Sequence, residues 1–352
     1  MTFGRRAFLR LVGAGLAAPA VSSSSWAQAW PAKPIHAVVP LVAGTGVDVL
    51  SRLVLNELSV GLGQPVVIEN KPGASGTTGG AVVAKADADG YTILTDSSSH
   101  TIIPSLFPSL PYDPVRDLAS VVPLGSMPFV LVCAQSKGFK TLQDLVAAAK
   151  ANPGKLNYAS AGIGTTNHLA TERLQLSAGF QATHVPYKGA GFITDVLSGR
   201  IDFAVIPLGP YIQSIRDGQL VALAVASSKR TALLADVPTT VEAGYANSST
   251  NFWVGLFAPV KTPRAILERL HDETLKGLDH PGVRDKLAQL AAEPMPLSMA
   301  EFEAMIADEF SSNRDLAKSI GLNFSMRWAL FTTRVIAGIS KYVPKYSFGP
   351  MA

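Results

Sequence analysis

The sequence predicts an α/β protein made of two lobes that close over a cleft. Apolar, strand-like segments alternate with helix-like segments through most of the chain, which is typical of parallel βαβ units. A strand leading into a glycine- and hydroxyl-rich turn and then a helix occurs twice, at residues 38–53 and 156–169. Two apolar runs, 119–134 and 252–258, are placed to cross between the halves of the chain, and two crossings make a hinge.

We expect each lobe to hold a mainly parallel sheet flanked by helices. Residues 30–125 together with 250–324 are predicted to form lobe 1, and residues 126–249 to form lobe 2. The two crossing strands would join them. A cleft between two such lobes is a common place for a small ligand.

Each element is predicted from its local pattern. Val47, Leu50 and Val54 recur at helical spacing after the first turn, and Thr141 with Asp144 approximates a capping box. Further strands are expected at 35–40, 66–69, 91–95, 156–161, 182–187, 201–206 and 220–226, and further helices at 166–178, 190–198, 210–217, 264–279, 281–292 and 299–319.

Composition argues against a nucleic-acid-binding protein. The chain has 352 residues, 47% of them hydrophobic and 16% charged, which is enough apolar material for two domains. Its net charge of +4 comes from the ends, because residues 1–29 carry three arginines, residues 325–352 carry four basic residues, and neither segment has an acid. Without these ends the body carries −3, so no basic surface for DNA or RNA is expected.

The first 29 residues have the pattern of an export signal. Arg5 and Arg6 precede an apolar stretch, and Ala27-Gln28-Ala29 is a small-x-small cleavage site. The paired arginines followed by Phe8, Leu9 and Arg10 are twin-arginine-like, and export by the general secretory route stays open. We therefore expect a periplasmic protein cleaved after Ala29. The single cysteine, Cys133, is expected to be a buried small hydrophobe.

The two glycine turns are the candidate ligand site. We call residues 43–46 the first glycine turn and residues 160–165 the second glycine turn. Backbone N–H groups at a helix start have no intrahelical partner and carry partial positive charge, so each turn could receive an anion. Neither turn contains Arg or Lys, and hydroxyl groups stand beside both. The plainer alternative is that the glycines only make the turns and a threonine caps the following helix.

A series of short motifs stands in order along the chain. The motifs are 44–52 (GTGVDVLSR), 69–76 (ENKPGASG), 88–94 (ADGYTIL), 112–114 (YDP), 158–169 (YASAGIGTTNHL), 184–189 (HVPYKG) and 236–244 (DVPTTVEAG). Together they resemble one known family, the solute receptors of tripartite tricarboxylate transporters, also called Bug proteins. The resemblance covers nearly all of residues 30–324, although Val42 and Thr45 stand where Pro and Gly are commoner in the family.

The resemblance implies a type II-like clamshell, similar to periplasmic binding proteins, that binds a small carboxylate and passes it to a membrane permease. The carboxylate could be a di- or tricarboxylate, an amino acid or an aromatic acid, and the receptor is expected to be a monomer without cofactor, metal or catalytic residues. Together with the hydroxyls at other strand ends, the candidate ligand-binding residues are Gly44, Thr45, Gly46, Asp48, Thr77, Thr78, Ser97, Ser160, Ala161, Gly162, Gly164, Thr165, Thr166, His168, Tyr187, Lys188 and Gly189.

Some of these residues have a second interpretation. Asp48 would repel an anion and more simply stabilises its own helix start, His168 fits packing or a supporting hydrogen bond, and Lys188 could pair with a distal carboxylate or be solvated. Ser160 is expected to donate to the ligand. The tail 325–352 lies outside the resemblance and is predicted to be a basic appendage.

Two rival functions remain at this point. A sensor that presents its loaded form to a membrane signalling partner fits the same sequence. A small-molecule hydrolase fits less well, because no G-x-S-x-G or H-E-x-x-H motif occurs, and no Walker A lysine follows either turn.

Overall fold

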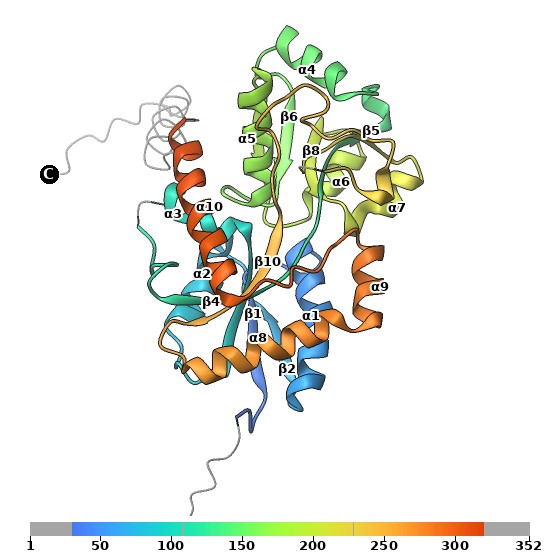
Figure 1. Ribbon diagram of the computed structural model, residues 1–352. Helices are drawn as coiled ribbons and strands as arrows, with labels where there is room; N and C mark the ends of the chain where they lie inside the picture. The colour runs from blue at the N-terminus through green and yellow to red at the C-terminus, as the bar shows by residue number, and fades with distance from the viewer. Residues whose placement is uncertain (1–29, 108, 228, 320–352) are drawn as a thin grey trace, which may run out of the picture.

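The computed structural model describes residues 30–107, 109–227 and 229–319 (Figure 1). The predicted signal segment 1–29, the end of predicted lobe 1 at 320–324 and the tail 325–352 lie outside these residues. The strands are β1 (Ile35–Val39), β2 (Val66–Asn70), β3 (Thr92–Ser97), β4 (Leu118–Ser126), β5 (Phe129–Ala134), β6 (Asn157–Ser160), β7 (Thr183–Pro186), β8 (Phe203–Pro207), β9 (Leu220–Val225) and β10 (Trp253–Pro259).

The helices follow the predicted spans closely. They are α1 (Gly46–Leu62), α2 (Thr77–Ala84), α3 (Ile103–Leu106), α4 (Leu142–Ala151), α5 (Thr166–Ala178), α6 (Phe192–Leu197), α7 (Ile212–Arg216), α8 (Arg264–Asp279), α9 (Pro281–Gln289) and α10 (Met299–Ser319), with short 3-10 turns that include η2 (Ala74–Gly76), η3 (Ser98–Thr101) and η5 (Gly209–Tyr211). No helix of the described ranges has the length and apolar character needed to cross a membrane.

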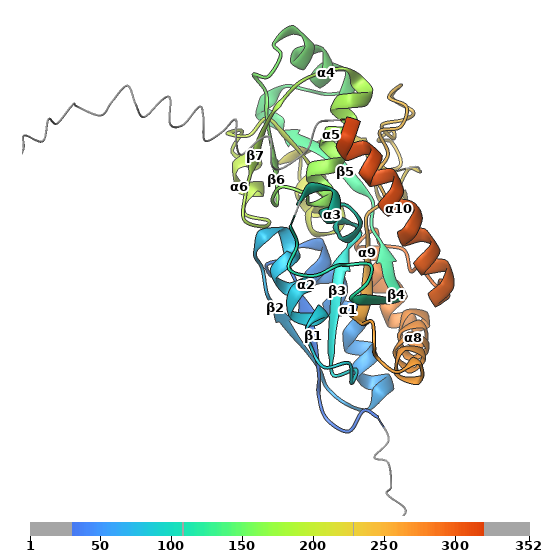
Figure 2. The ribbon, with the colours of Figure 1, turned by 90° about the vertical axis from the view of Figure 1, so that its left-hand side faces the viewer.

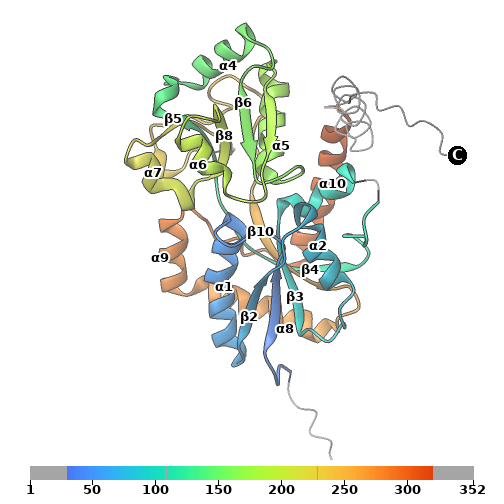
Figure 3. The ribbon, with the colours of Figure 1, turned by 180° about the vertical axis from the view of Figure 1, so that it is seen from behind.

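The strands form two five-stranded sheets, each covered by helices and each the centre of one lobe (Figures 1 and 3). The first sheet has the order β2-β1-β3-β10-β4, and the second has the order β7-β6-β8-β5-β9. This arrangement confirms the predicted two-lobed α/β class. The exact lobe boundaries, 125/126 and 249/250, stay a proposal.

Each sheet is mainly parallel, as expected, with one reversed strand that makes it mixed. β1 is parallel to β2 and β3, but β10 is antiparallel to β3 and β4. In the second sheet β6 is parallel to β7 and β8, while β5 is antiparallel to β8 and β9. The reason is the hinge: β5 and β10 enter their lobes from the cleft side, so they run opposite to the strands that end at the cleft.

The hinge consists of two crossing segments held together by backbone hydrogen bonds. The first crossing passes from β4 to β5, where Met127 N–H donates to Phe252 O at 3.0 Å. On the lobe 2 side, Ala226 N–H donates to Phe129 O at 2.7 Å, and Thr250 N–H donates to Ala226 O at 2.6 Å. The return crossing therefore lies before β10. The predicted crossing strand 252–258 instead pairs inside the first sheet.

The buried faces explain how the cleft is positioned. Val47, Leu50, Val54 and Leu58 of α1 are buried against the first sheet, as their spacing indicated, and every residue of β5 is buried. Cys133 lies within β5, and burial raises the pKa of its thiol to about 11. Because β1 and β6 both end at the cleft, α1 and α5 both begin there (Figure 3).

Candidate functional site

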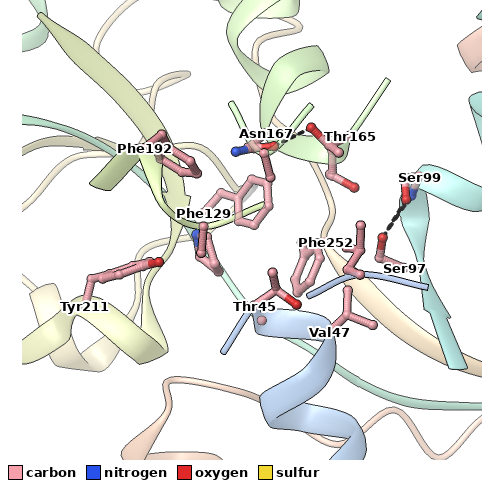
Figure 4. A pocket seen from close by; sticks show the side chains of 16 residues that line it. Thr45, Val47, Ser97, Ser99, Phe129, Thr165, Asn167, Phe192, Tyr211 and Phe252 are labelled. Carbon is pink, nitrogen blue, oxygen red and sulfur yellow. Dashed lines mark hydrogen bonds between the residues drawn. The ribbon is translucent and has the colours of Figure 1, made fainter. Parts of the chain in front are cut away.

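A cavity between the lobes lies where α1 and α5 begin (Figure 4). It has an empty volume of about 490 Å³, including its open mouth. The lining residues are Leu41, Thr45, Gly46, Val47, Ser97, Ser99, Phe129, Ala161, Thr165, Thr166, Asn167, Ala190, Phe192, Pro207, Tyr211 and Phe252. Both lobes contribute, so a ligand here would touch both.

The first glycine turn presents the start of α1 to this cavity. Thr45 caps the helix in an extended conformation with φ −73°, and its hydroxyl accepts a hydrogen bond from Asp48 N–H at 3.4 Å. Gly44 takes the left-handed conformation, with φ 82°, so the β-branched Thr45 is not strained. The first intrahelical bond recorded is from Val49 N–H to Thr45 O, which leaves the amides of Gly46 and Val47 without an intrahelical acceptor.

Asp48 supports the first turn from behind and does not line the cavity. Its buried carboxylate accepts from Gly44 N–H at 3.0 Å, from Asn70 Nδ2 at 2.9 Å and from Arg52 Nε at 3.0 Å. Burial alone would raise the pKa of Asp48, but the hydrogen bonds from Arg52, Gly44 and Asn70 outweigh it and hold the pKa below its ordinary value of 3.8. The carboxylate is therefore fully engaged within its own lobe.

The second glycine turn presents the start of α5 from the opposite lobe. Thr165 precedes the helix with φ −71°, and its Oγ1 lies 2.6 Å from both Gly162 O and Asn167 Oδ1 (Figure 4). Leu169 N–H donates to Thr165 O at 3.2 Å, so the amides of Thr166 and Asn167 precede the first intrahelical bond. Two helix N-termini thus face one cavity (Figures 3 and 4).

Ser160 and His168 hold the second turn and do not line the cavity. The hydroxyl of Ser160 is fully buried, 2.6 Å from His184 Nε2, and accepts from Gly162 N–H at 3.2 Å. His168 Nδ1 accepts from Gly164 N–H at 3.1 Å, which assigns the proton of a neutral ring to Nε2. These positions correct the expectation that Ser160 donates to the ligand: its oxygen is directed into the turn.

The rest of the cavity is mostly apolar, with hydroxyls from Ser97, Ser99 and Tyr211. The rings of Phe129 and Phe252 stack with centroids 4.8 Å apart, one from each crossing segment. Phe192 and Tyr211 lie at the far side, and burial raises the pKa of the Tyr211 phenol (Figure 4). No Asp, Glu, Lys, Arg or His is among the lining residues. An anion in the cavity would therefore be neutralised by dipoles, not by a cationic side chain.

The structure brings some of the predicted residues together and places others elsewhere. Those that line the cavity are Thr45, Gly46, Ser97, Ala161, Thr165 and Thr166; those that do not are Gly44, Asp48, Thr77, Thr78, Ser160, Gly162, Gly164, His168, Tyr187, Lys188 and Gly189.

The residues away from the cavity have recognisable positions. Thr77 Oγ1 donates to Ala74 O at 2.9 Å, Thr78 stands beside it in the first turn of α2, and the Tyr187 hydroxyl donates to Asp195 at 2.5 Å. Lys188 is exposed. Gly189 takes φ 93°, and a Cβ there would lie 2.2 Å from Val42 Cγ2 of the other lobe, so this glycine permits close lobe contact.

The sequence interpretation missed most of the apolar lining. The residues not foreseen are Leu41, Val47, Ser99, Phe129, Asn167, Ala190, Phe192, Pro207, Tyr211 and Phe252. Asn167 and Val47 could have been predicted from the sequence, because they follow the caps of the two helices. Phe129 and Phe252 stand at the two ends of the hinge, and an aromatic residue at each crossing was the available signal.

Comparison with known proteins gives a consistent family. Residues 50–322 match the model of the tripartite tricarboxylate transporter family receptor. A protein of Pseudomonas sp. strain P51 from the tcbD-tcbE intergenic region is 39% identical over 286 residues, covering 80% of this chain and 85% of that protein. BugT of Bordetella pertussis is 34% identical over 316 residues, covering 89% and 97%.

Solved structures show the same two-lobed arrangement. An R. palustris protein solved with adipate has a TM-score of 0.80 and 31% identity, covering 83% of this chain and 98% of that one. MatC from Rhodopseudomonas palustris with bound malate has a TM-score of 0.77 and 30% identity, covering 81% and 99%. Similar chains therefore bind small carboxylates.

Proposed function

This chain belongs to the tripartite tricarboxylate transporter receptor family, and we propose that it captures a small carboxylate between its lobes for delivery to a membrane permease. The family and its structural neighbours are periplasmic solute-binding proteins, not enzymes. One observation carries the proposal: the starts of α1 and α5 converge on a single uncharged cavity.

The amides at these starts can replace the water that a carboxylate loses. Gly46 and Val47 supply donors from lobe 1, and Thr166 and Asn167 supply them from lobe 2. Hydrogen bonds to a charged group are worth about 1.5–3 kcal/mol each. Because the donors are divided between the lobes, the closed arrangement is the better binder, and a ligand shifts the population toward it.

The lining also limits the class of carboxylate that fits the cavity. The stacked Phe129 and Phe252 offer an apolar floor, and no cationic side chain of the described residues lines the cavity to receive a second carboxylate. We infer that a compact carboxylate with an apolar or aromatic body fits better than a tricarboxylate. The Tyr211 hydroxyl can hydrogen-bond to a neutral polar group at the far end.

The family supports a proposal for the cellular location of the receptor and for its partner. Its members are periplasmic, and we propose that this chain is exported and cleaved after Ala29. We further propose that the receptor acts as a monomer and docks on a tripartite permease. The motivating observations are the arginine pair of the leader and the match to a transporter receptor over most of the chain.

A calorimetric screen of the exported protein tests the proposal. Aromatic and aliphatic monocarboxylates, dicarboxylates, tricarboxylates and amino acids are titrated in turn, and one class is expected to bind saturably. Gly46→Val should weaken that binding at least tenfold, because a Cβ at Gly46 already lies 3.3 Å from Pro207 across the cleft. Gly282→Val, at the start of the distant α9, is the matched control. Equal affinity in both variants would contradict this site.

A further inference from the structure

A second cavity is lined by residues of α5, α10 and the return crossing. Figure 2 shows α5 and α10, which contribute to it. Its empty volume is about 690 Å³, including its mouth. Thr166 borders both cavities, and Ser98, whose hydroxyl lies 3.0 Å from that of Thr166, lines only this one. The lining differs from the first cavity because it is polar and contains a cation.

The cation is Arg173, which shares one face of α5 with Thr166 and Leu169. Its Nη2 donates to Asn313 Oδ1 at 3.4 Å, and within the described ranges no carboxylate oxygen lies within 4.0 Å of it. Burial lowers the pKa of the guanidinium, which Glu309 partly opposes, yet an arginine stays charged in proteins. A half-buried cation of this kind calls for a counterion.

The nearby acid is engaged elsewhere. Glu309 accepts from Trp253 Nε1 at 3.0 and 3.1 Å and from Thr101 Oγ1 at 3.2 Å. Burial raises the pKa of its carboxyl despite these hydrogen bonds and Arg173. Glu309 is thus fixed to its own lobe and does not form an ion pair with Arg173.

The other polar groups of the lining are mostly neutral. Ser249 and Ser312 bring hydroxyls to the cavity, and Asn251 and Asn313 bring amides. Such groups can donate hydrogen bonds to an oxyanion that lies on Arg173.

We propose that this cavity is a second anion site, which takes a small oxyanion on the guanidinium of Arg173, with the hydroxyls of Ser249 and Ser312 in the same lining. The guanidinium fork matches two oxygens of a sulfate, phosphate or carboxylate group. The site is separate from the cleft cavity, since Arg173 does not line that cavity.

The anion site lies between the two lobes, so an anion bound there should affect lobe closure. Arg173 belongs to lobe 2, whereas Ser98 and Ser312 belong to elements packed on lobe 1. An anion on Arg173 that also accepts from these hydroxyls stabilises the closed arrangement, and by linkage it raises the affinity of the cleft for its own ligand.

The test is titration of the exported protein with sodium sulfate, sodium phosphate and sodium acetate, with ionic strength matched by sodium chloride. We expect at least one oxyanion to bind saturably and to compact the protein in small-angle scattering. Arg173→Gln should weaken that binding at least tenfold, and Arg116→Gln, an exposed arginine elsewhere, should leave it unchanged.

Arg173→Lys keeps the test decisive if Arg173→Gln does not fold. It keeps the positive charge but loses the planar fork, so folding should be kept while oxyanion binding weakens severalfold. No saturable binding to the unaltered protein overturns the proposal. Equal binding in the unaltered protein and Arg173→Lys, with Arg173→Gln either equal as well or unfolded, also overturns it.

Discussion

The two glycine turns do the same task with different supports. Behind the first turn, a buried carboxylate, Asp48, accepts from Gly44 N–H and is held in turn by Arg52 and Asn70. Behind the second, a hydroxyl and an imidazole accept the corresponding amides, Ser160 from Gly162 and His168 from Gly164. Both turns present helix N-termini to the cavity, so the side chains that attract notice in the sequence serve mainly to hold backbone in place.

The largest loss of stability should follow removal of the charge on Asp48, which supports the first glycine turn. Asp48→Asn keeps the shape but loses the charge on the hydrogen bonds to Gly44, Arg52 and Asn70, so we expect unfolding free energy to fall by about 2 kcal/mol. Urea denaturation with an unchanged m-value measures this. Asp144→Asn, an exposed helix cap on α4, should cost less. Equal losses would mean that burial of the Asp48 network adds nothing.

Acid should weaken the first turn selectively. The pKa of folded Asp48 lies below 3.8, so the unfolded chain takes up a proton at a higher pH than the folded protein does. Its contribution is therefore complete above the ordinary value and is lost as pH falls through the folded-state pKa. The stability difference between the unaltered protein and Asp48→Asn should be constant near neutrality and shrink below pH 3.8. A difference that stays constant down to the lowest accessible pH would contradict this.

Removal of the neutral Ser160 hydroxyl, which supports the second glycine turn, should cause a smaller loss of stability. Ser160→Ala deletes the hydrogen bonds to Gly162 and His184, and we expect a loss of about 1 kcal/mol in stability with a few-fold loss of ligand affinity. Thr171→Val removes another buried hydroxyl of α5, away from the turn, and should leave affinity unchanged. A tenfold or greater loss in Ser160→Ala alone would restore Ser160 as a direct ligand donor.

The sequence predicted the helices and the turns well because their signals are local. Thr141 and Asp144 do form a capping box, and α5, α8 and α10 have the bounds that were predicted for them. The direction of β10 could not be predicted, since pairing depends on where the chain re-enters the lobe. The stacking of Phe129 on Phe252 could not be predicted either, because the two rings meet only when both crossings form, although an aromatic residue at each crossing was a local signal.

The smallest effect is expected at a residue that the sequence favoured. Lys188 is exposed and does not line the cavity, so Lys188→Gln should change ligand affinity less than twofold, which is about 0.4 kcal/mol. Calorimetric titration of Lys188→Gln and Gly46→Val with the same ligand compares the loss of affinity at an exposed charge with the loss at the start of α1. A large loss in Lys188→Gln would place a distal carboxylate of the ligand at this lysine.

The most direct test of the account is a crystal structure with the carboxylate that the screen identifies. The carboxylate oxygens should lie between the starts of α1 and α5, about 2.7–3.2 Å from the amides of Gly46 or Val47 and of Thr166 or Asn167, directly or through one ordered water. A carboxylate seated instead on Lys188, or held by one lobe alone, would contradict the claim that the dipoles of both turns form the site.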